Sequence, residues 1–336
     1  MSAADNGTTP PVTSPPDRLP SRSWRFAIKA LISLALIGFL LNRTDLQTLG
    51  ALFRSLRVPV FLASFLLYIV AQILSTLRWR CLLQAEKINL SVWRLISLYF
   101  EGMFFNLMLP TLIGGDVVRG YQVFHLTKQH EASLASILVE RLSGYVALVT
   151  IACIALIVTR EHLREPVVVW LTVTTAAGLV GIIAGLLSDR LQARFFKLLS
   201  HTGLARFHDT MHRQYEAMQR YWKHPRALLL AVGLSLVLQT FVILIFYLIS
   251  RSLNLSVPLG SFFLFVPLIS MVSMLPISVA GLGIREGSAI YFFAKVGLDS
   301  ASALSLSLLW FAVTALSSGL GGIVFLVGHP DQDARS

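Results

Sequence analysis

The stretch Met108-Leu-Pro-Thr-Leu-Ile-Gly-Gly-Asp-Val-Val-Arg119 has a counterpart in Met274-Leu-Pro-Ile-Ser-Val-Ala-Gly-Leu-Gly-Ile-Arg285. The two share Met, Leu, Pro, Gly and Arg at the same spacing. Pro, Gly and Arg are residues that a lipid-buried helix avoids, so each half of the chain combines a helix break with a positive charge. Interrupted hydrophobic segments at corresponding places in two halves indicate a transporter binding site. Two unrelated proline kinks are the alternative, because neighbouring helices can satisfy the freed backbone groups.

The amino-acid composition indicates whether this protein folds in water or in a membrane. Of 336 residues, 55% are hydrophobic and only 13% are charged, and the mean hydropathy is +0.71. A soluble domain has about 25% charged residues, so the composition predicts a polytopic membrane protein. The formal net charge of +11 then fits cytoplasmic loops and lipid headgroups better than nucleic acid. Cys81 and Cys153 lie in different environments and indicate neither a disulfide nor a metal site.

Six apolar runs are long enough to cross a hydrocarbon core of about 30 Å. They cover about 25–42, 58–77, 133–158, 166–187, 226–250 and 301–327. Two further apolar regions, 92–130 and 258–298, are interrupted at Pro110 and Pro276 and each predict a helical hairpin. Three runs separate the two breaks, so the hairpins should enter the membrane from opposite faces. The predicted fold is an all-α polytopic membrane protein with about six full transmembrane helices and two interrupted hairpins in an inverted repeat.

The expected domain organisation is simple. Residues 1–24 are rich in Pro, Ser and Thr and predict a disordered cytoplasmic tail. Residues 25–328 form one integral membrane domain, with halves at about 25–158 and 166–328 and a basic cytoplasmic segment at 188–226. Residues 329–336 form a short tail. No cleavable signal peptide is expected, because the first apolar run ends without a cleavage pattern.

Loop charges set the expected orientation in the cytoplasmic membrane. The loops at 78–94 and 188–226 have an excess of Lys and Arg and should lie inside, whereas the balanced loop at 159–165 should lie outside. Both chain ends are then cytoplasmic. The segment 43–57 would be outside despite its arginines. We interpret it as an interfacial helix, because its apolar residues recur at helical spacing.

The two breaks also contain the candidate binding residues. In the first, Gly114 and Gly115 precede Asp116, which we expect to cap a new helix, and Arg119 lies in its first turn. The second break contains Gly281, Gly283, Arg285 and Glu286 in a similar order.

A guanidinium beside free N–H groups at a helix N-terminus favours an anion such as a phosphate or phosphodiester. We therefore expect Arg119 and Arg285 to hold an anionic headgroup. In the structural alternative, Asp116 pairs with Arg119, and Arg285 pairs with Glu286 or a distant acid.

Other charged residues within apolar segments need partners, because a charge at the bilayer centre costs roughly 2.5–3.5 kcal/mol on insertion scales. Glu101 lies too deep in its segment to reach the headgroups easily. It is a candidate coupling proton carrier or counter-ion to an arginine, with a simple salt bridge as the alternative. Glu140 and Arg141, near the start of the run at 133–158, are candidates for ion pairing or charge relay.

Five motifs give a family resemblance over nearly the whole chain from about residue 25. They are Asn106-Leu-Met-Leu-Pro110, Gly114-Gly-Asp-Val-Val-Arg119, Val139-Glu-Arg-Leu-Ser-Gly144, Leu275-Pro-Ile-Ser278 and Gly281-Leu-Gly-Ile-Arg-Glu-Gly287. The chain resembles the flippase-like family typified by the membrane region of lysyl-phosphatidylglycerol synthases. Thr111 and Ala280 replace glycines that are common in the family, which leaves the identity of the headgroup open.

The resemblance implies transport of a polar-headgroup lipid across the cytoplasmic membrane. Aminoacyl-phosphatidylglycerol is the typical cargo of the fused enzymes, and polyprenyl- or hopanoid-linked lipids are proposed for other members. The chain ends at Ser336, so we expect a stand-alone flippase without the aminoacyl-transferase domain and without enzymatic activity.

Two alternatives belong to other functional classes. A membrane enzyme would need a nucleophile, metal site or acid–base pair, but the sequence has no HExxH and no Gly-x-Ser-x-Gly motif. A non-transporting partner of a lipid or cell-envelope biosynthesis enzyme could dock through the basic segment 188–226, although contact with anionic lipid explains this segment equally simply. No phosphate-binding loop indicates a primary pump, and we expect no cofactor and no metal.

Overall fold

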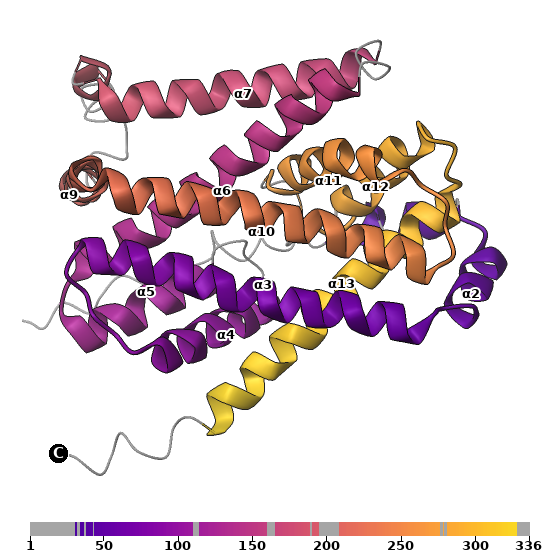
Figure 1. The fold of residues 1–336 in the computed structure, drawn as a ribbon, viewed down its shortest axis with the longest axis horizontal. Helices are drawn as coiled ribbons and strands as arrows, with labels where there is room; N and C mark the ends of the chain where they lie inside the picture. The colour runs from indigo at the N-terminus through magenta and orange to yellow at the C-terminus, as the bar shows by residue number, and fades with distance from the viewer. Residues whose placement is uncertain are drawn as a thin grey trace, which may run out of the picture.

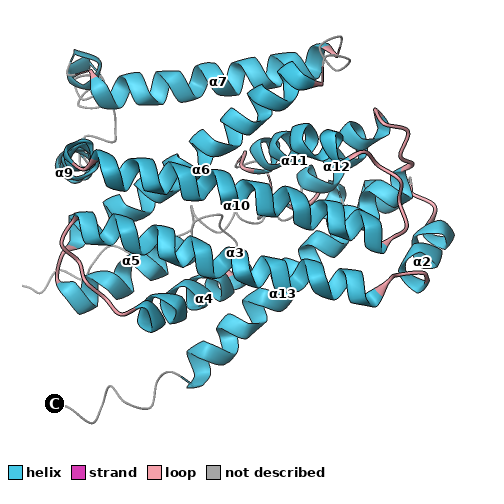
Figure 2. Cartoon of the chain, viewed as in Figure 1, coloured by secondary structure: helices cyan, strands magenta, loops and turns pink. Residues whose placement is uncertain are grey.

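A computed structural model describes residues 44–109, 114–159, 165–188, 190–194, 208–275 and 281–327, together with residues 31, 34–36, 38–42 and 278. All regular structure in these residues is helical (Figure 2). Within them, five helices are long and apolar enough to cross a membrane: α3 (Val58–Ala85), α6 (His130–Val158), α7 (Pro166–Leu187), α10 (Pro225–Ser252) and α13 (Ser300–Val327). The all-α polytopic membrane fold is confirmed. Half of the expected span at 25–42 is described, and these residues are helical, whereas both terminal tails lie outside the described residues.

Each interrupted region contains two shorter helices. The first pair is α4 (Val92–Met108) and α5 (Gly114–Thr127), and the second is α11 (Leu259–Ser273) and α12 (Ile284–Ala294). The members of each pair pack against each other, as a hairpin requires. Pro110 and Pro276, the expected break residues, lie outside the described residues. α2 (Leu46–Arg54) matches the amphipathic helix expected at 43–57 and packs against α13. Two further elements, α9 (His208–Arg220) and the short η3 (Tyr221–Lys223), precede α10.

The central pair of helices, α3 and α10, runs antiparallel (Figure 1). At one end, the backbone N–H of Arg57 donates to the carbonyl of Ser252 over 2.8 Å. At the other end, the hydroxyl of Tyr221 donates to the carbonyl of Leu82 over 3.2 Å, and Arg220 pairs with Glu86. Helix α3 therefore ends where α10 begins.

This antiparallel pair places the two hairpins at opposite ends of the molecule (Figure 1). α4 follows the end of α3 after a short loop, and α11 follows the end of α10 in the same way. Because α3 and α10 point in opposite directions, the hairpins enter the bundle from opposite sides. The arrangement is the one that an inverted repeat requires.

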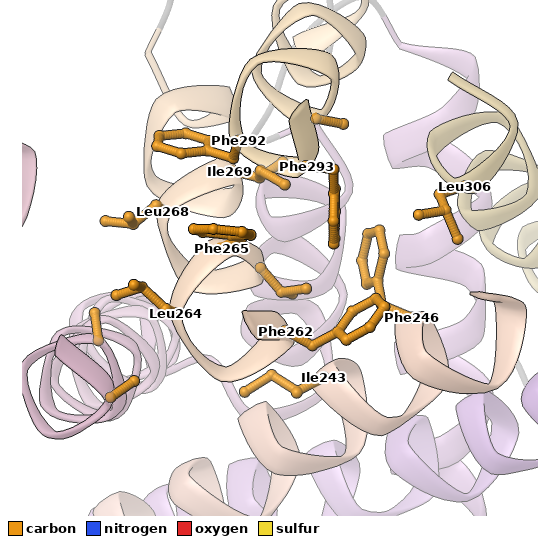
Figure 3. Close-up of a cluster of buried hydrophobic side chains, with 14 of the residues drawn as sticks. Ile243, Phe246, Phe262, Leu264, Phe265, Leu268, Ile269, Phe292, Phe293 and Leu306 are labelled. Atoms are coloured by element: carbon orange, nitrogen blue, oxygen red, sulfur yellow. The ribbon is translucent and has the colours of Figure 1, made fainter. Parts of the chain in front are cut away.

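The largest hydrophobic core lies around the second hairpin. Phe262 and Phe265 of α11 contact Phe293 of α12, with ring centroids 5.1 and 5.7 Å apart (Figure 3). Residues of α3, α6, α7, α10 and α13 also belong to this cluster. The second hairpin is thus anchored by aromatic packing.

The first hairpin packs in a smaller apolar cluster and is also held by close backbone crossings. A Cβ added to Gly115 of α5 would lie 1.8 Å from the carbonyl oxygen of Gly102 in α4, and one added to Gly321 of α13 would lie 1.9 Å from that of Phe100. Only glycine permits either approach. Three helices are therefore stacked at near-minimal separation.

Candidate functional site

The first turns of α5 supply an aspartate and an arginine that are both buried. Arg119 Nη2 donates to Asp116 Oδ1 at 2.8 Å and to Glu140 Oε2 of α6 at 3.2 Å. The relative exposures of Arg119, Asp116 and Glu140 are only 4%, 6% and 2%. Buried charges of this kind persist in a membrane when they are paired, as they are here.

The expected capping role of Asp116 is wrong. Helix α5 begins at Gly114, so Asp116 lies inside its first turn. The side chain of Asn106 accepts a hydrogen bond from the N–H of Gly115 over 2.8 Å and satisfies a backbone donor at this helix start. The carboxylate of Asp116 remains available for arginines.

Helix α6 contributes the remaining predicted charges. Arg141 donates through Nε to Asp116 Oδ2 at 2.7 Å and also through Nη2. Its side chain is 46% exposed, in contrast to the buried Arg119. Four predicted residues, Asp116, Arg119, Glu140 and Arg141, therefore form one connected network.

Arg78 completes the network, and sequence reasoning missed it. We expected Arg78 in a cytoplasmic loop beginning at residue 78, but α3 continues to Ala85 and buries this arginine. Arg78 Nη2 donates to Glu140 Oε1 at 2.8 Å, and Nη1 donates to Ser235 Oγ of α10 at 2.7 Å. An arginine at the end of an apolar run gives no signal that distinguishes a loop from a buried helix face.

Two aromatic rings lie against the guanidinium of Arg119. Its Cζ lies 4.3 Å from the ring centroid of Tyr99 and 4.7 Å from that of Trp79. The indole of Trp79 is fixed by a hydrogen bond from Nε1 to Ser136 Oγ over 3.0 Å. Within the described part of the chain, Arg119 Nη1 is buried and has no hydrogen-bond partner. The two rings and the two carboxylates thus fix the orientation of the guanidinium, while its Nη1 group remains without a hydrogen-bond acceptor.

The network borders a cavity of about 410 Å³ between the two halves. Its lining residues come from α3, α4, α5, α6, α10, α11 and α13: Tyr68, Gln72, Arg78, Tyr99, Gly102, Met103, Asn106, Asp116, Arg119, Glu140, Arg141, Gly144, Tyr145, Leu148, Gln239, Val242, Ser270, Met274 and Trp310. Gln72, Gly144 and Gln239 lie at the midpoints of α3, α6 and α10, roughly 20 Å from either helix end. The cavity is therefore at the middle depth of the spanning helices.

Glu101 lies outside this network. It is buried in α4, and its carboxylate accepts from Ser97 Oγ at 2.9 Å and from Gln122 Nε2 at 2.6 Å. In the part of the chain that the structure describes, Glu101 forms no ion pair with an arginine. It also does not line the cavity. The counter-ion role considered for Glu101 is not seen in this conformation.

The second hairpin forms a separate network. Arg285 donates to Glu286 Oε1 through Nε at 3.0 Å and Nη2 at 2.5 Å, and Nε also lies 3.0 Å from Ser307 Oγ of α13. Glu286 Oε2 accepts from the N–H of Gly283 over 2.7 Å at the start of α12. Neither Arg285 nor Glu286 lines the cavity, so the two predicted arginines do not meet around it.

The predicted glycines have different local functions. Gly281 and Gly283 have positive φ angles of 76° and 84°, which other residues adopt only with strain. Gly114 and Gly115 are buried and helical, and Gly115 makes the close crossing to Gly102. At Gly115, one of the candidate binding residues, the backbone of another helix therefore lies where a ligand would have to approach.

The cavity is an anion-compatible site by charge and by chemistry. Its lining contains three arginines and two carboxylates, which leaves one positive charge in excess. Among the described residues, no group of three or more His, Cys, Asp or Glu side chains is arranged to hold a metal ion. Guanidinium donors around a polar cavity suit the oxygens of a phosphate or carboxylate.

Comparison with known proteins agrees with this membrane architecture. The profile of the lysylphosphatidylglycerol synthase TM region matches residues 26–322. A UPF0104 membrane protein of Methanothermobacter thermautotrophicus (strain Delta H) is 24% identical over 333 residues, which cover 92% of this chain and 94% of that relative. No solved structure matches the chain significantly. Because the family profile covers most of the chain, the protein belongs to the family of lysylphosphatidylglycerol synthase transmembrane regions.

Proposed function

We propose that the protein is a flippase that moves a lipid with an anionic headgroup across the cytoplasmic membrane. The headgroup passes through the arginine-lined cavity while the acyl chains stay in the bilayer. The observation that carries this proposal is the polar cavity of about 410 Å³ at the middle depth of the spanning helices. A buried ion network is often no more stabilising than apolar packing of the same volume, so stability alone does not account for the charges.

The cavity offers suitable donors for a phosphate. Arg119 Nη1 has no partner among the described residues, and the half-exposed Arg141 can exchange its contact with Asp116 for a ligand oxygen. The single excess positive charge of the lining is neutralised by one phosphodiester. Charge-assisted hydrogen bonds to such a group contribute about 1.5–3 kcal/mol each.

The hairpins at opposite ends of the bundle support an alternating-access cycle. In the present conformation, Arg285 is paired with Glu286 and Ser307. In this proposal, Arg285 binds the headgroup when the cavity opens to the opposite side of the membrane. Glu101 remains the candidate carrier of a coupling proton. The proposal assigns no covalent chemistry to the site, and it keeps both chain ends in the cytoplasm, the orientation that the loop charges favour.

The test is lipid movement in proteoliposomes that contain tail-labelled phosphatidylglycerol and the purified full-length chain. Arg141→Gln should slow movement by about tenfold or more, because one charge-assisted contact is lost. Arg220→Gln is the matched control. Its side chain is 44% exposed, close to the 46% of Arg141, and its ion pair with Glu86 lies outside the cavity.

Equal rates for wild type, Arg141→Gln and Arg220→Gln would show that the cavity is not the transport path. A role as a non-transporting partner of a lipid or cell-envelope biosynthesis enzyme would then be the better explanation. A rate lowered equally by both substitutions would indicate a general effect on folding or insertion.

A further inference from the structure

One part of the cavity wall is polar but uncharged. Gln72 of α3 and Gln239 of α10 both line the cavity and both lie at the midpoints of their helices. Within the described residues, neither side-chain carboxamide forms a hydrogen bond. A polar group at this depth without a partner costs several kcal/mol, so these two amides need water or a ligand.

A carboxamide presents both donors and an acceptor, as a hydroxyl group does. A ligand rich in hydroxyls can therefore satisfy both glutamines at once. A bare phosphate cannot, because its oxygens mostly accept and would leave the amide carbonyls unpaired. The glutamines thus favour a headgroup that extends beyond its phosphate into a polyol.

The charged part of the wall disfavours an amine on the same headgroup. Both carboxylates stay paired with a buried arginine: Glu140 binds Arg78 and Arg119, and Asp116 keeps Arg119 even when Arg141 turns to a ligand oxygen. No acidic group in the described lining is left for an ammonium. Among the aromatic rings of the lining, Tyr99 already faces Arg119, and Trp310 is stacked on Phe246 and meets Tyr68 edge-to-face. The phosphate of the headgroup already neutralises the single excess positive charge of the lining, so an added ammonium would be left without a counter-charge.

We propose that the cavity selects a lipid whose headgroup contains one phosphate and several hydroxyls but no amine, with Gln72 and Gln239 recognising the hydroxyls. This inference rests on the proposed flippase function and narrows its cargo. A phosphoglycerol and a cyclic polyol phosphate share the required chemistry. An aminoacylated phospholipid does not.

The experiment measures lipid retention by native mass spectrometry. The purified full-length protein is incubated with equal amounts of four lipids that have identical acyl chains: phosphatidylglycerol, phosphatidylinositol, phosphatidic acid and lysyl-phosphatidylglycerol. Wild type should retain phosphatidylglycerol or phosphatidylinositol about tenfold over the other two, because phosphatidic acid leaves the amides unpaired and lysyl-phosphatidylglycerol brings an ammonium without an acid. The preferred lipid of the two shows whether the hydroxyls belong to a glycerol or to a cyclic polyol.

Two variants test the glutamines directly. Gln72→Leu/Gln239→Leu should reduce the preference over phosphatidic acid to within about twofold, because leucine keeps the volume and removes the amide. Gln84→Leu is the control, since Gln84 is an exposed residue of α3 outside the cavity. Gln72→Glu should raise retention of lysyl-phosphatidylglycerol by about tenfold, because it supplies the missing acid. A gain of this kind cannot come from misfolding.

Three outcomes overturn the inference: a wild-type preference for lysyl-phosphatidylglycerol, an unchanged preference in the double variant, or no gain with Gln72→Glu. If Arg141→Gln still slows lipid movement in those cases, the flippase function stands and only the cargo assignment fails. If Arg141→Gln changes neither retention nor movement of any lipid, the proposed function fails as well.

Discussion

The carboxylate of Glu140 links two arginines that come from different parts of the chain. It accepts from Arg78 at 2.8 Å and from Arg119 at 3.2 Å, and it is almost fully buried. The hydroxyl of Tyr99 adds a third contact at 3.3 Å. Because Arg78 and Arg119 are both buried, the carboxylate of Glu140 is the counter-charge that makes their burial tolerable.

Replacing Glu140 with Gln should therefore destabilise the protein by about 3–5 kcal/mol, the usual cost of leaving a buried charge unpaired. Thermal unfolding in detergent would measure the change. The double variant Arg78→Gln/Glu140→Gln should recover part of the loss, because one unpaired charge is removed. Strictly additive effects of the two substitutions would show that the pair is not energetically coupled.

At the level of single residues, sequence reasoning identified part of the candidate site. A charge within an apolar run is visible in the sequence, so Asp116, Arg119, Glu140 and Arg141 could be selected and do lie together. The neutral lining residues could not be selected, since nothing in a sequence shows which helix faces a cavity. For the same reason, the separation of Arg285 from the cavity was not predictable from its equivalent position in the repeat.

Among the helices, the crossing of α13 over α4 depends on one glycine. Gly321→Ala should separate the helices and lower stability by several kcal/mol, because the added Cβ would lie 1.9 Å from the backbone oxygen of Phe100. Gly319→Ala in the same helix is the control, as no atom lies within 4 Å of its added Cβ. The melting temperatures of both variants measure the difference in stability. Similar melting temperatures would mean that the two helices can move apart at little cost in free energy.

Helix positions were predictable, but helix ends were less so. The run at 166–187 matches α7 at both ends because a proline begins it and polar residues follow. Helix α3 instead continues past the expected end at residue 77. Trp79, Leu82 and Leu83 are fully buried in this extension, and their packing extends the helix beyond its purely apolar part.

The molecule as a whole has its two hairpins at opposite ends, and this arrangement can be tested by cysteine labelling in intact cells. Asn89 lies exposed between α3 and α4, and Ser256 lies exposed between α10 and α11. With Cys81 and Cys153 replaced by Ala, a membrane-impermeant maleimide added outside should label Ser256→Cys but not Asn89→Cys. The loop charges predict this orientation. Labelling of both cysteines from the same side would rule out the inverted arrangement.

Helix α13 contacts both hairpins, and this has a mechanical consequence. Ser307 touches Arg285 near one end of α13, and Gly321 touches Phe100 near the other, roughly 21 Å further along. If α13 tilts as a rigid body, its pivot lies between these two contacts. Any tilt about that point displaces the two contacts in opposite directions. Helix α13 thus couples the two hairpins mechanically, and a tilt of this one helix would move the contacts of both.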